Sequence, residues 1–123
     1  MAKDDYDVVV YKILIYLYAC LKGKIVFNKE VFYKTIGKEH INEAYLYKIY
    51  KMMSDEELIE NLTFAKAWGN DFMLISEEEE MQITVKGIHY LKDNSKMKEV
   101  GKYLLETADI IAKLISLVGL AAV

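Results

Sequence analysis

Two periods of hydrophobic and polar positions follow one another along this chain, and they outline its central elements. Between Ile41 and Met53 the apolar residues recur at the spacing of one helix face. That face consists of Ile41, Tyr45, Ile49, Met52 and Met53. The opposite face consists of Glu43, Tyr47, Tyr50 and Lys51. The pattern predicts a helix that seals a core with one face and presents the other face to a partner.

After this helix the period shortens to that of β-strands. Two β-prone runs, Leu62–Trp68 and Phe72–Ile75, enclose the turn Gly69-Asn70-Asp71 and predict a hairpin. Trp68 stands at the end of the first strand, where we expect it to cap the core beneath the hairpin; the alternative is an anchor for a partner. A helix followed by a hairpin is typical of a winged helix.

The chain upstream predicts two further helices. Asp4–Lys22 is apolar nearly all round, which places it at the centre of the fold. Asn28 is a good N-cap for a short helix that ends near Ile36. Between them, Lys24–Phe27 is either a small strand or a tight connection. The short helix and the Ile41 helix together form the pair expected of a helix-turn-helix.

Downstream of the hairpin lies an acidic run, Glu77–Glu80, which we expect to be solvated. Thr84 then suits the N-cap of a helix that continues through Leu91. A break over Lys92–Ser95 precedes a final amphipathic helix with a wide apolar stripe. The stripe includes Met97, Val100, Leu104, Ile111, Leu114 and Val118.

That wide stripe needs cover, and three surfaces could provide it. Packing against a second copy is the favoured interpretation, packing on the chain's own first helix is the second, and a membrane or a foreign partner is the third. A membrane fits least, because interfacial helices favour a basic polar face and this one is balanced. The residues predicted for dimerisation are Val100, Leu104, Ile111, Leu114 and Val118.

Length and composition agree with a single compact unit. The chain has 123 residues, 54% of them hydrophobic, and no proline. The predicted fold class is mainly α with a small β-hairpin, an α+β winged helix-turn-helix with a long C-terminal amphipathic helix. Residues 1–94 form the winged-helix domain, and residues 95–123 form the helix that packs on the domain or on a second subunit.

The charged residues bear on nucleic-acid binding. All sixteen basic residues are lysine, and arginine is the commonest reader of guanine in the major groove. Residues 54–80 hold nine acidic residues against one lysine, a net charge of −8. The whole chain carries −3, so the remainder carries +5. The absence of arginine argues against sequence-specific DNA binding without excluding it, and it equally fits an AT-rich genome. The acidic segment opposes DNA binding at the hairpin.

Sequence signatures of catalysis are missing. There is no Gly-rich phosphate loop, no nucleophile elbow and no metal-binding His or Cys motif. His40 and His89 lie on separate elements, and the single Cys20 has apolar neighbours that indicate a buried thiol. We therefore expect a non-enzymatic protein with no metal and no cofactor.

The first helix also bears on location. The apolar run Val8–Leu21 has fourteen residues, short of the roughly 20 that span a bilayer. Acidic residues precede it where an export signal needs positive charge. We expect a cytoplasmic protein with no membrane contact.

The segment Ile83–Asn94 resembles a stretch of a known family. Its Ile-Thr-Val-Lys-Gly-Ile-His-Tyr-Leu is similar to the Leu-Thr-x-Lys-Gly-x-x-Tyr-Leu that follows the hairpin in the YjcQ-like family of small bacterial and phage proteins. Glu39–Ile49 and Ser95–Lys98 also fit that family. The resemblance implies a winged-helix fold and, by analogy, a regulatory role in DNA binding. It supplies no catalytic or binding residue that can be carried over.

Two functional hypotheses follow, and fold analogy favours the first. In the first, a dimer binds DNA, and Lys48 and Lys51 contact phosphate. In the second, the acidic hairpin, the exposed tyrosine face or the apolar C-terminal helix binds a protein partner. A structural homodimer without a ligand is a third interpretation. The residues predicted to contact DNA or a partner are Asn42, Tyr47, Lys48, Tyr50, Lys51 and Lys66.

Overall fold

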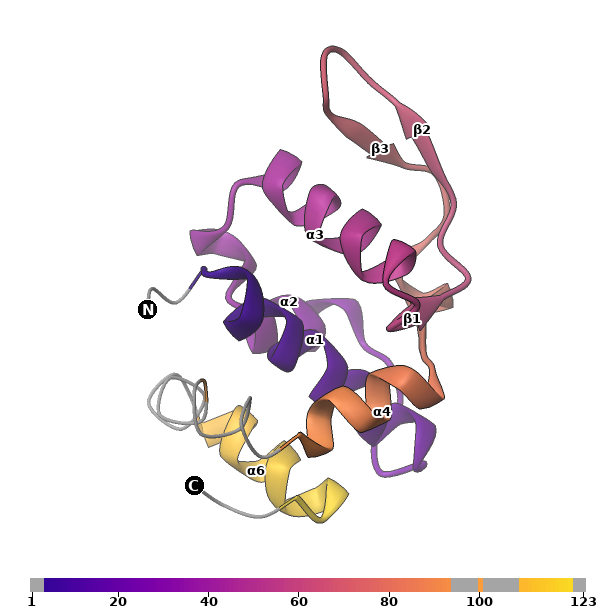
Figure 1. Cartoon of the computed structure of the whole chain (residues 1–123). Coiled ribbons are helices and arrows are strands. Elements are labelled where there is room, and N and C mark those ends of the chain that lie inside the picture. Colours follow the sequence, from indigo (N-terminus) through magenta and orange to yellow (C-terminus); the bar gives the residue numbers. More distant parts are fainter. Residues whose placement is uncertain (1–3, 94–99, 101–108, 121–123) are drawn as a thin grey trace.

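The computed structural model describes residues 4–93, 100 and 109–120, and within them the predicted class is confirmed: mainly α with a small hairpin, in a winged-helix-like arrangement (Figure 1). The helices are α1 Tyr6–Leu21, α2 Lys29–Ile36, α3 Glu43–Asp55, α4 Val85–Lys92 and α6 Asp109–Val118. The strands are β1 Ile59–Glu60, β2 Phe64–Lys66, β3 Phe72–Leu74 and β4 Gln82–Ile83. Two short 3₁₀ helices, η1 Lys38–His40 and η2 Glu78–Glu80, complete the order.

Helix α1 is the centre of the core, as its apolar sequence predicts. Every residue from Val8 to Ala19 is buried. Helices α2, α3, α4 and α6 and strand β4 all pack on it (Figure 1). The hydroxyl of Tyr11 lies 3.1 Å from the carbonyl oxygen of Tyr90 and 3.2 Å from that of Leu91, so it can donate to the last turn of α4. One central helix thus organises the whole molecule.

The helix boundaries follow from local capping. The side-chain oxygen of Asn28 accepts a hydrogen bond from the Val31 amide at 3.1 Å and starts α2. Gly37 ends α2 with φ 71°, a left-handed conformation that glycine adopts at little cost. Thr84 begins α4 by accepting from the Gly87 amide at 3.0 Å. These caps agree with the sequence predictions.

The described part of the C-terminal stripe packs inside its own chain. Val100, Ile111, Leu114 and Val118 are buried in the single core, and α6 lies on α1. Lys22 supports this packing by donating to the Val118 carbonyl oxygen at 3.0 Å. These four residues are therefore covered by the chain's own core, the second of the three covers that the sequence allows. The reason is that α1 is apolar on the side that α6 covers.

Other parts of the predicted stripe fall on residues that the structure does not describe. Met97, Leu104 and the predicted start of the helix at Ser95 lie outside the described residues.

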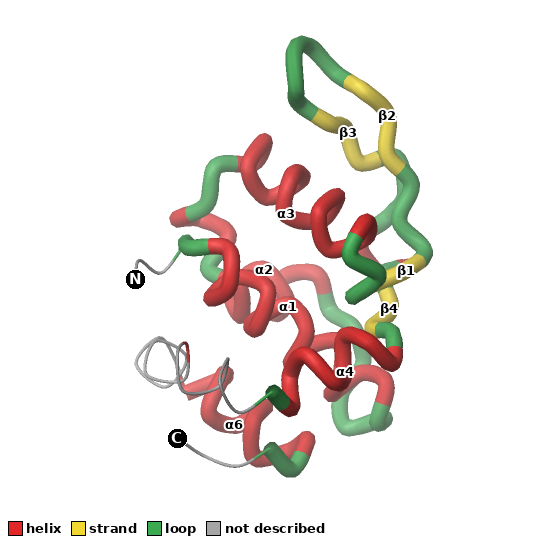
Figure 2. The backbone as a smooth tube through the Cα atoms, in the orientation of Figure 1, coloured by secondary structure: helices red, strands yellow, loops and turns green. Residues whose placement is uncertain are grey.

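The predicted hairpin is present, and its second strand packs on α3. Strands β2 and β3 are antiparallel, with Phe64 opposite Leu74 and Lys66 opposite Phe72. We call this hairpin the wing. A second antiparallel pair, β1 with β4, closes its base (Figure 2). The sequence did not predict that pair, because two residues per strand are too few to show a period. Residues 24–27 form a connection without strand structure.

Gly87 provides a test of how tightly α4 meets the rest of the core. A Cβ atom there would lie 2.7 Å from Ile83 Cγ1 and closer still to the Leu58 carbonyl oxygen. Gly87→Ala should therefore lower the free energy of unfolding by about 1–3 kcal/mol through overpacking. Urea denaturation measures this loss.

The matched control is Lys86→Ala, which changes an exposed neighbour in the same helix. It should shift stability by less than about 0.5 kcal/mol. Alanine normally stabilises a helix relative to glycine, so a gain in stability for Gly87→Ala would contradict the packing described here.

Candidate functional site

Helix α3 and the wing lie side by side and form the face on which both functional hypotheses depend (Figure 1). On the face of the wing turned to α3, Phe64, Phe72 and Leu74 are apolar and half-buried. Lys66 lies opposite Phe72 on the same face but is exposed. Lys51 of α3 extends over the Phe72 ring, with its ammonium 5.5 Å from the ring centroid. The wing is thus seated on α3 and covers part of its outer surface.

The lysines predicted to contact phosphate are already paired with carboxylates. Lys48 Nζ lies 3.1 Å from Asp71 Oδ1 at the tip of the wing. Lys51 Nζ lies 2.6 Å from Asp55 Oδ1, one turn further along α3. Both pairs are partly exposed, so each contributes little to stability. They do, however, lower the positive charge that α3 presents to solvent.

The other predicted contact residues differ in their surroundings. Asn42 is exposed, but its side-chain oxygen caps α3 by accepting from the Tyr45 amide at 3.1 Å. Tyr47 is half-buried beside Tyr50, and Lys66 is exposed on the wing. The structure therefore does not bring the six predicted residues together on one open surface.

Tyr50 corrects the predicted orientation of α3. It was expected on the exposed face, but it is completely buried with Leu46, Ile49 and Met53. Met52, expected inward, is exposed. The buried face of α3 includes Tyr50 because its aromatic ring packs in the core and its hydroxyl has a buried hydrogen-bond acceptor.

That acceptor is Glu78, in the acidic run. The Tyr50 hydroxyl donates to Glu78 Oε2 at 2.7 Å, and the Tyr33 hydroxyl donates to Oε1. Glu78 is only 5% exposed, so the expectation of a fully solvated run is wrong at this position. Its neighbours Glu77 and Glu80 stay at the surface and cap η2 reciprocally. One carboxylate thereby ties the exit of the wing to both α2 and α3.

The same contact affects the two tyrosines. Burial, followed by the charge and hydrogen bond of Glu78, raises the pKa of Tyr50 far above its usual value. Burial and the Glu78 hydrogen bond raise the pKa of Tyr33 in the same direction. Both phenols therefore remain neutral donors at physiological pH, as a buried carboxylate requires.

The wing also carries apolar residues that point away from the core. Trp68 is 94% exposed at its tip, and Met73 and Ile75 on its outer side are 58% and 62% exposed. Trp68 was expected to cap the core, and that expectation is wrong because Phe64, Phe72 and Leu74 already fill the inner side. We refer to Trp68, Met73 and Ile75 as the exposed wing residues.

Sequence reasoning missed the exposure of Met73 and Ile75. The available signal was the alternation of β3, in which Phe72 and Leu74 take the inner positions and leave Met73 and Ile75 outside.

The two histidines and Cys20 lie on three separate elements. His40 lies in η1 with Nε2 3.3 Å from Glu39 Oε1, and His89 is exposed on α4. Burial raises the pKa of the half-buried Cys20 thiol to about 11, so it stays protonated at neutral pH. Within the described residues no group of three metal-ligating side chains occurs. Among the described helices, none combines the length and apolar character that crossing a bilayer requires.

Comparison with known families agrees with the motif at Ile83–Asn94. The family model described as YjcQ protein matches residues 11–110. The chain belongs to the YjcQ family. This YjcQ match includes α3, the wing, η2 and α4, so it covers the entire candidate face. No curated protein and no solved structure shows a significant match.

Glu78 offers a direct test of how this YjcQ-family chain holds its wing. Glu78→Ala leaves the Tyr33 and Tyr50 hydroxyls without their acceptor, and should lower the free energy of unfolding by about 2–3 kcal/mol. Glu79→Ala, its exposed neighbour, should cost less than about 0.5 kcal/mol. Urea denaturation of both variants would refute the anchoring role of Glu78 if they proved equally stable.

The raised tyrosine pKa predicts a loss of stability in alkali. Above pH 10 the unfolded chain releases the Tyr50 proton while the folded chain retains it. The contribution of Tyr50 is thus complete below pH 10 and declines above it, by up to about 1.4 kcal/mol per pH unit. Denaturation from pH 9 to 11 measures this slope. Tyr50→Phe should make the slope shallower, and an unchanged slope would contradict the assignment to Tyr50.

Proposed function

We propose that this YjcQ-family chain is a non-enzymatic winged-helix protein that binds another protein through its wing. The observation that carries this proposal is the exposure of Trp68 at the wing tip together with Met73 and Ile75. Large apolar side chains gathered on one short element are typical of an interaction site. Tryptophan is moreover among the residues that contribute most to protein interfaces.

The charge around the wing supports a partner with a definite chemistry. Exposed carboxylates give the base of the wing, next to Ile75, a negative charge: Glu60, Glu77, Glu79 and Glu80. An apolar centre with a charged rim is the usual anatomy of a transient interface. The complementary surface is an apolar hollow for Trp68, with lysine or arginine where it meets the base of the wing.

DNA binding is less well supported by the same face. Lys48 and Lys51 are paired with Asp71 and Asp55, and residues 54–80 carry a net charge of −8. A wing inserted at DNA would bring those carboxylates toward phosphate, which costs free energy. The DNA hypothesis therefore depends on the fold alone, and fold does not determine function.

Site-specific photocrosslinking tests the proposed interface. Replacing Trp68 by benzoylphenylalanine in the full chain, in the cells that produce it, should give one discrete light-dependent adduct with a partner protein. Met73→Ser combined with Ile75→Ser should abolish the adduct, because these exposed residues would frame the contact. Once the partner is identified, Trp68→Ala should weaken its binding by about tenfold or more.

The matched control places the same photoreactive residue at Val85, which is also exposed but lies on α4. It should give no such adduct. Equal adducts from both positions, or an adduct unaffected by the serine substitutions, would count against a wing interface.

A DNA titration decides between the two hypotheses. We expect no binding of a fluorescent AT-rich duplex at tens of micromolar protein in low salt, where even non-specific binders register. Binding that weakens with salt and disappears in Lys48→Ala plus Lys51→Ala would overturn the proposal in favour of DNA. Lys24→Ala plus Lys34→Ala, both exposed elsewhere, is the control for net charge.

A further inference from the structure

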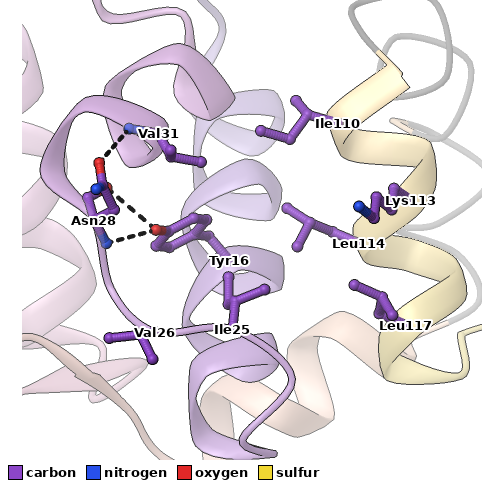
Figure 3. A pocket seen from close by; sticks show the side chains of 9 residues that line it. All are labelled: Tyr16, Ile25, Val26, Asn28, Val31, Ile110, Lys113, Leu114 and Leu117. Carbon is purple, nitrogen blue, oxygen red and sulfur yellow. Dashed lines mark hydrogen bonds between the residues drawn. The ribbon is translucent and has the colours of Figure 1, made fainter.

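A pocket of about 260 Å³ opens between α1, α2 and α6, apart from the α3–wing face (Figure 3). Its walls come from three helices and from the connection after α1. The residues that line it are Tyr16, Ile25, Val26, Asn28, Val31, Ile110, Lys113, Leu114 and Leu117.

The walls of this pocket are mostly apolar, and the Tyr16 hydroxyl in them is already hydrogen-bonded. The Tyr16 hydroxyl accepts from the Asn28 amide at 2.9 Å and donates to the Asn28 carbonyl oxygen at 3.2 Å. The Asn28 side-chain oxygen is taken by the Val31 amide. These bonds are drawn in Figure 3, which also shows Ile110 and Leu114 pointing from α6 toward Tyr16. A ligand there meets hydrocarbon and one aromatic ring.

The mouth of the pocket supplies two further features. Val26 is 89% exposed and Val31 is also exposed, so apolar surface continues out to solvent. Lys113 is the one charged residue among the lining side chains. Within the described residues no carboxylate lies in ion-pair distance of Lys113. The pocket thus combines an apolar interior with a single positively charged lining residue.

We propose that this pocket binds a small aryl-alkanoate, with its ring between Tyr16 and Leu114 and its carboxylate on Lys113. Size supports this class, because an apolar cavity of about 150 Å³ accommodates benzene. The larger volume here leaves room for a ring and a short aliphatic chain. The ligand carboxylate would form an ion pair with Lys113, the only charged residue among the lining side chains. This assignment does not depend on the proposed function of the wing.

Phenylpropionate is the probe, and its neutral amide phenylpropionamide is the matched control ligand. Titration of the full chain, labelled at its Ile, Leu and Val methyl groups, should shift the signals of Ile110, Leu114 and Leu117. The dissociation constant should be about 1 mM, as the number of ligand atoms allows. The amide should bind roughly three- to fivefold more weakly, since a partly exposed ion pair contributes that much.

Two variants place the ligand. Lys113→Gln should weaken phenylpropionate to the level of the amide and leave binding of the amide unchanged. Val31→Trp should fill the pocket from its mouth and abolish binding of both compounds, with circular dichroism as the check on folding. Lys24→Gln, an exposed lysine that does not line the pocket, should change neither affinity.

Three results would overturn the assignment. The first is no methyl shift at about 10 mM phenylpropionate, which is ten times the expected constant. The second is equal affinity for acid and amide, or no effect of Lys113→Gln. The third is that the shifted methyl groups lie outside α6 and the residue 25–31 segment.

Discussion

A helix without a polar face must be covered on all sides, and the structure of this protein depends on that constraint. Helix α1 is buried from Val8 to Ala19, so no side of it can remain open to water. Burying a side chain the size of leucine or isoleucine is worth about 1.5–3 kcal/mol, and α1 contains many of them. The other helices therefore pack around α1, and α6 covers one side of it. The surfaces that remain accessible to solvent or to a partner therefore belong to the elements around α1.

The wing is the main peripheral element, and it has two unlike sides. Its inner residues, Phe64, Phe72 and Leu74, rest against α3, while its outer residues face solvent. Where the chain leaves the wing, the buried Glu78 carboxylate accepts hydrogen bonds from two phenol hydroxyls, which carry no charge. Removing a carboxylate from water is costly unless it is hydrogen-bonded, and Tyr33 and Tyr50 supply those bonds. The acidic run is thus partly structural, and only its flanking residues contribute to the surface field.

The sequence predicts local features well and long-range partners poorly. The caps at Asn28, Gly37 and Thr84 and the hairpin turn at Gly69 were predictable because each is determined by adjacent residues. The burial of Glu78 was not, since its partners lie 28 and 45 positions away. The predicted orientation of α3 was wrong for the same reason. Tyr50 has both an aromatic ring and a hydroxyl, and only its distant acceptor, Glu78, determines that it lies on the buried face. The sequence also left open which surface covers α6. A wide apolar stripe predicts that a helix face is buried, but it does not specify the surface against which it packs.

The two ends of the wing are held with very different strength. Its base is fixed by the β1–β4 pair and by a carboxylate inside the core, whereas its contacts with α3 nearer the tip include Lys51 over the Phe72 ring and the partly exposed ion pair between Lys48 and Asp71. Such a pair is worth about 1 kcal/mol or less and weakens with salt. The wing is therefore joined to the core more firmly at its base than at its tip. Separating the tip from α3 would break the Lys48–Asp71 pair and would leave the Lys48 ammonium to solvent.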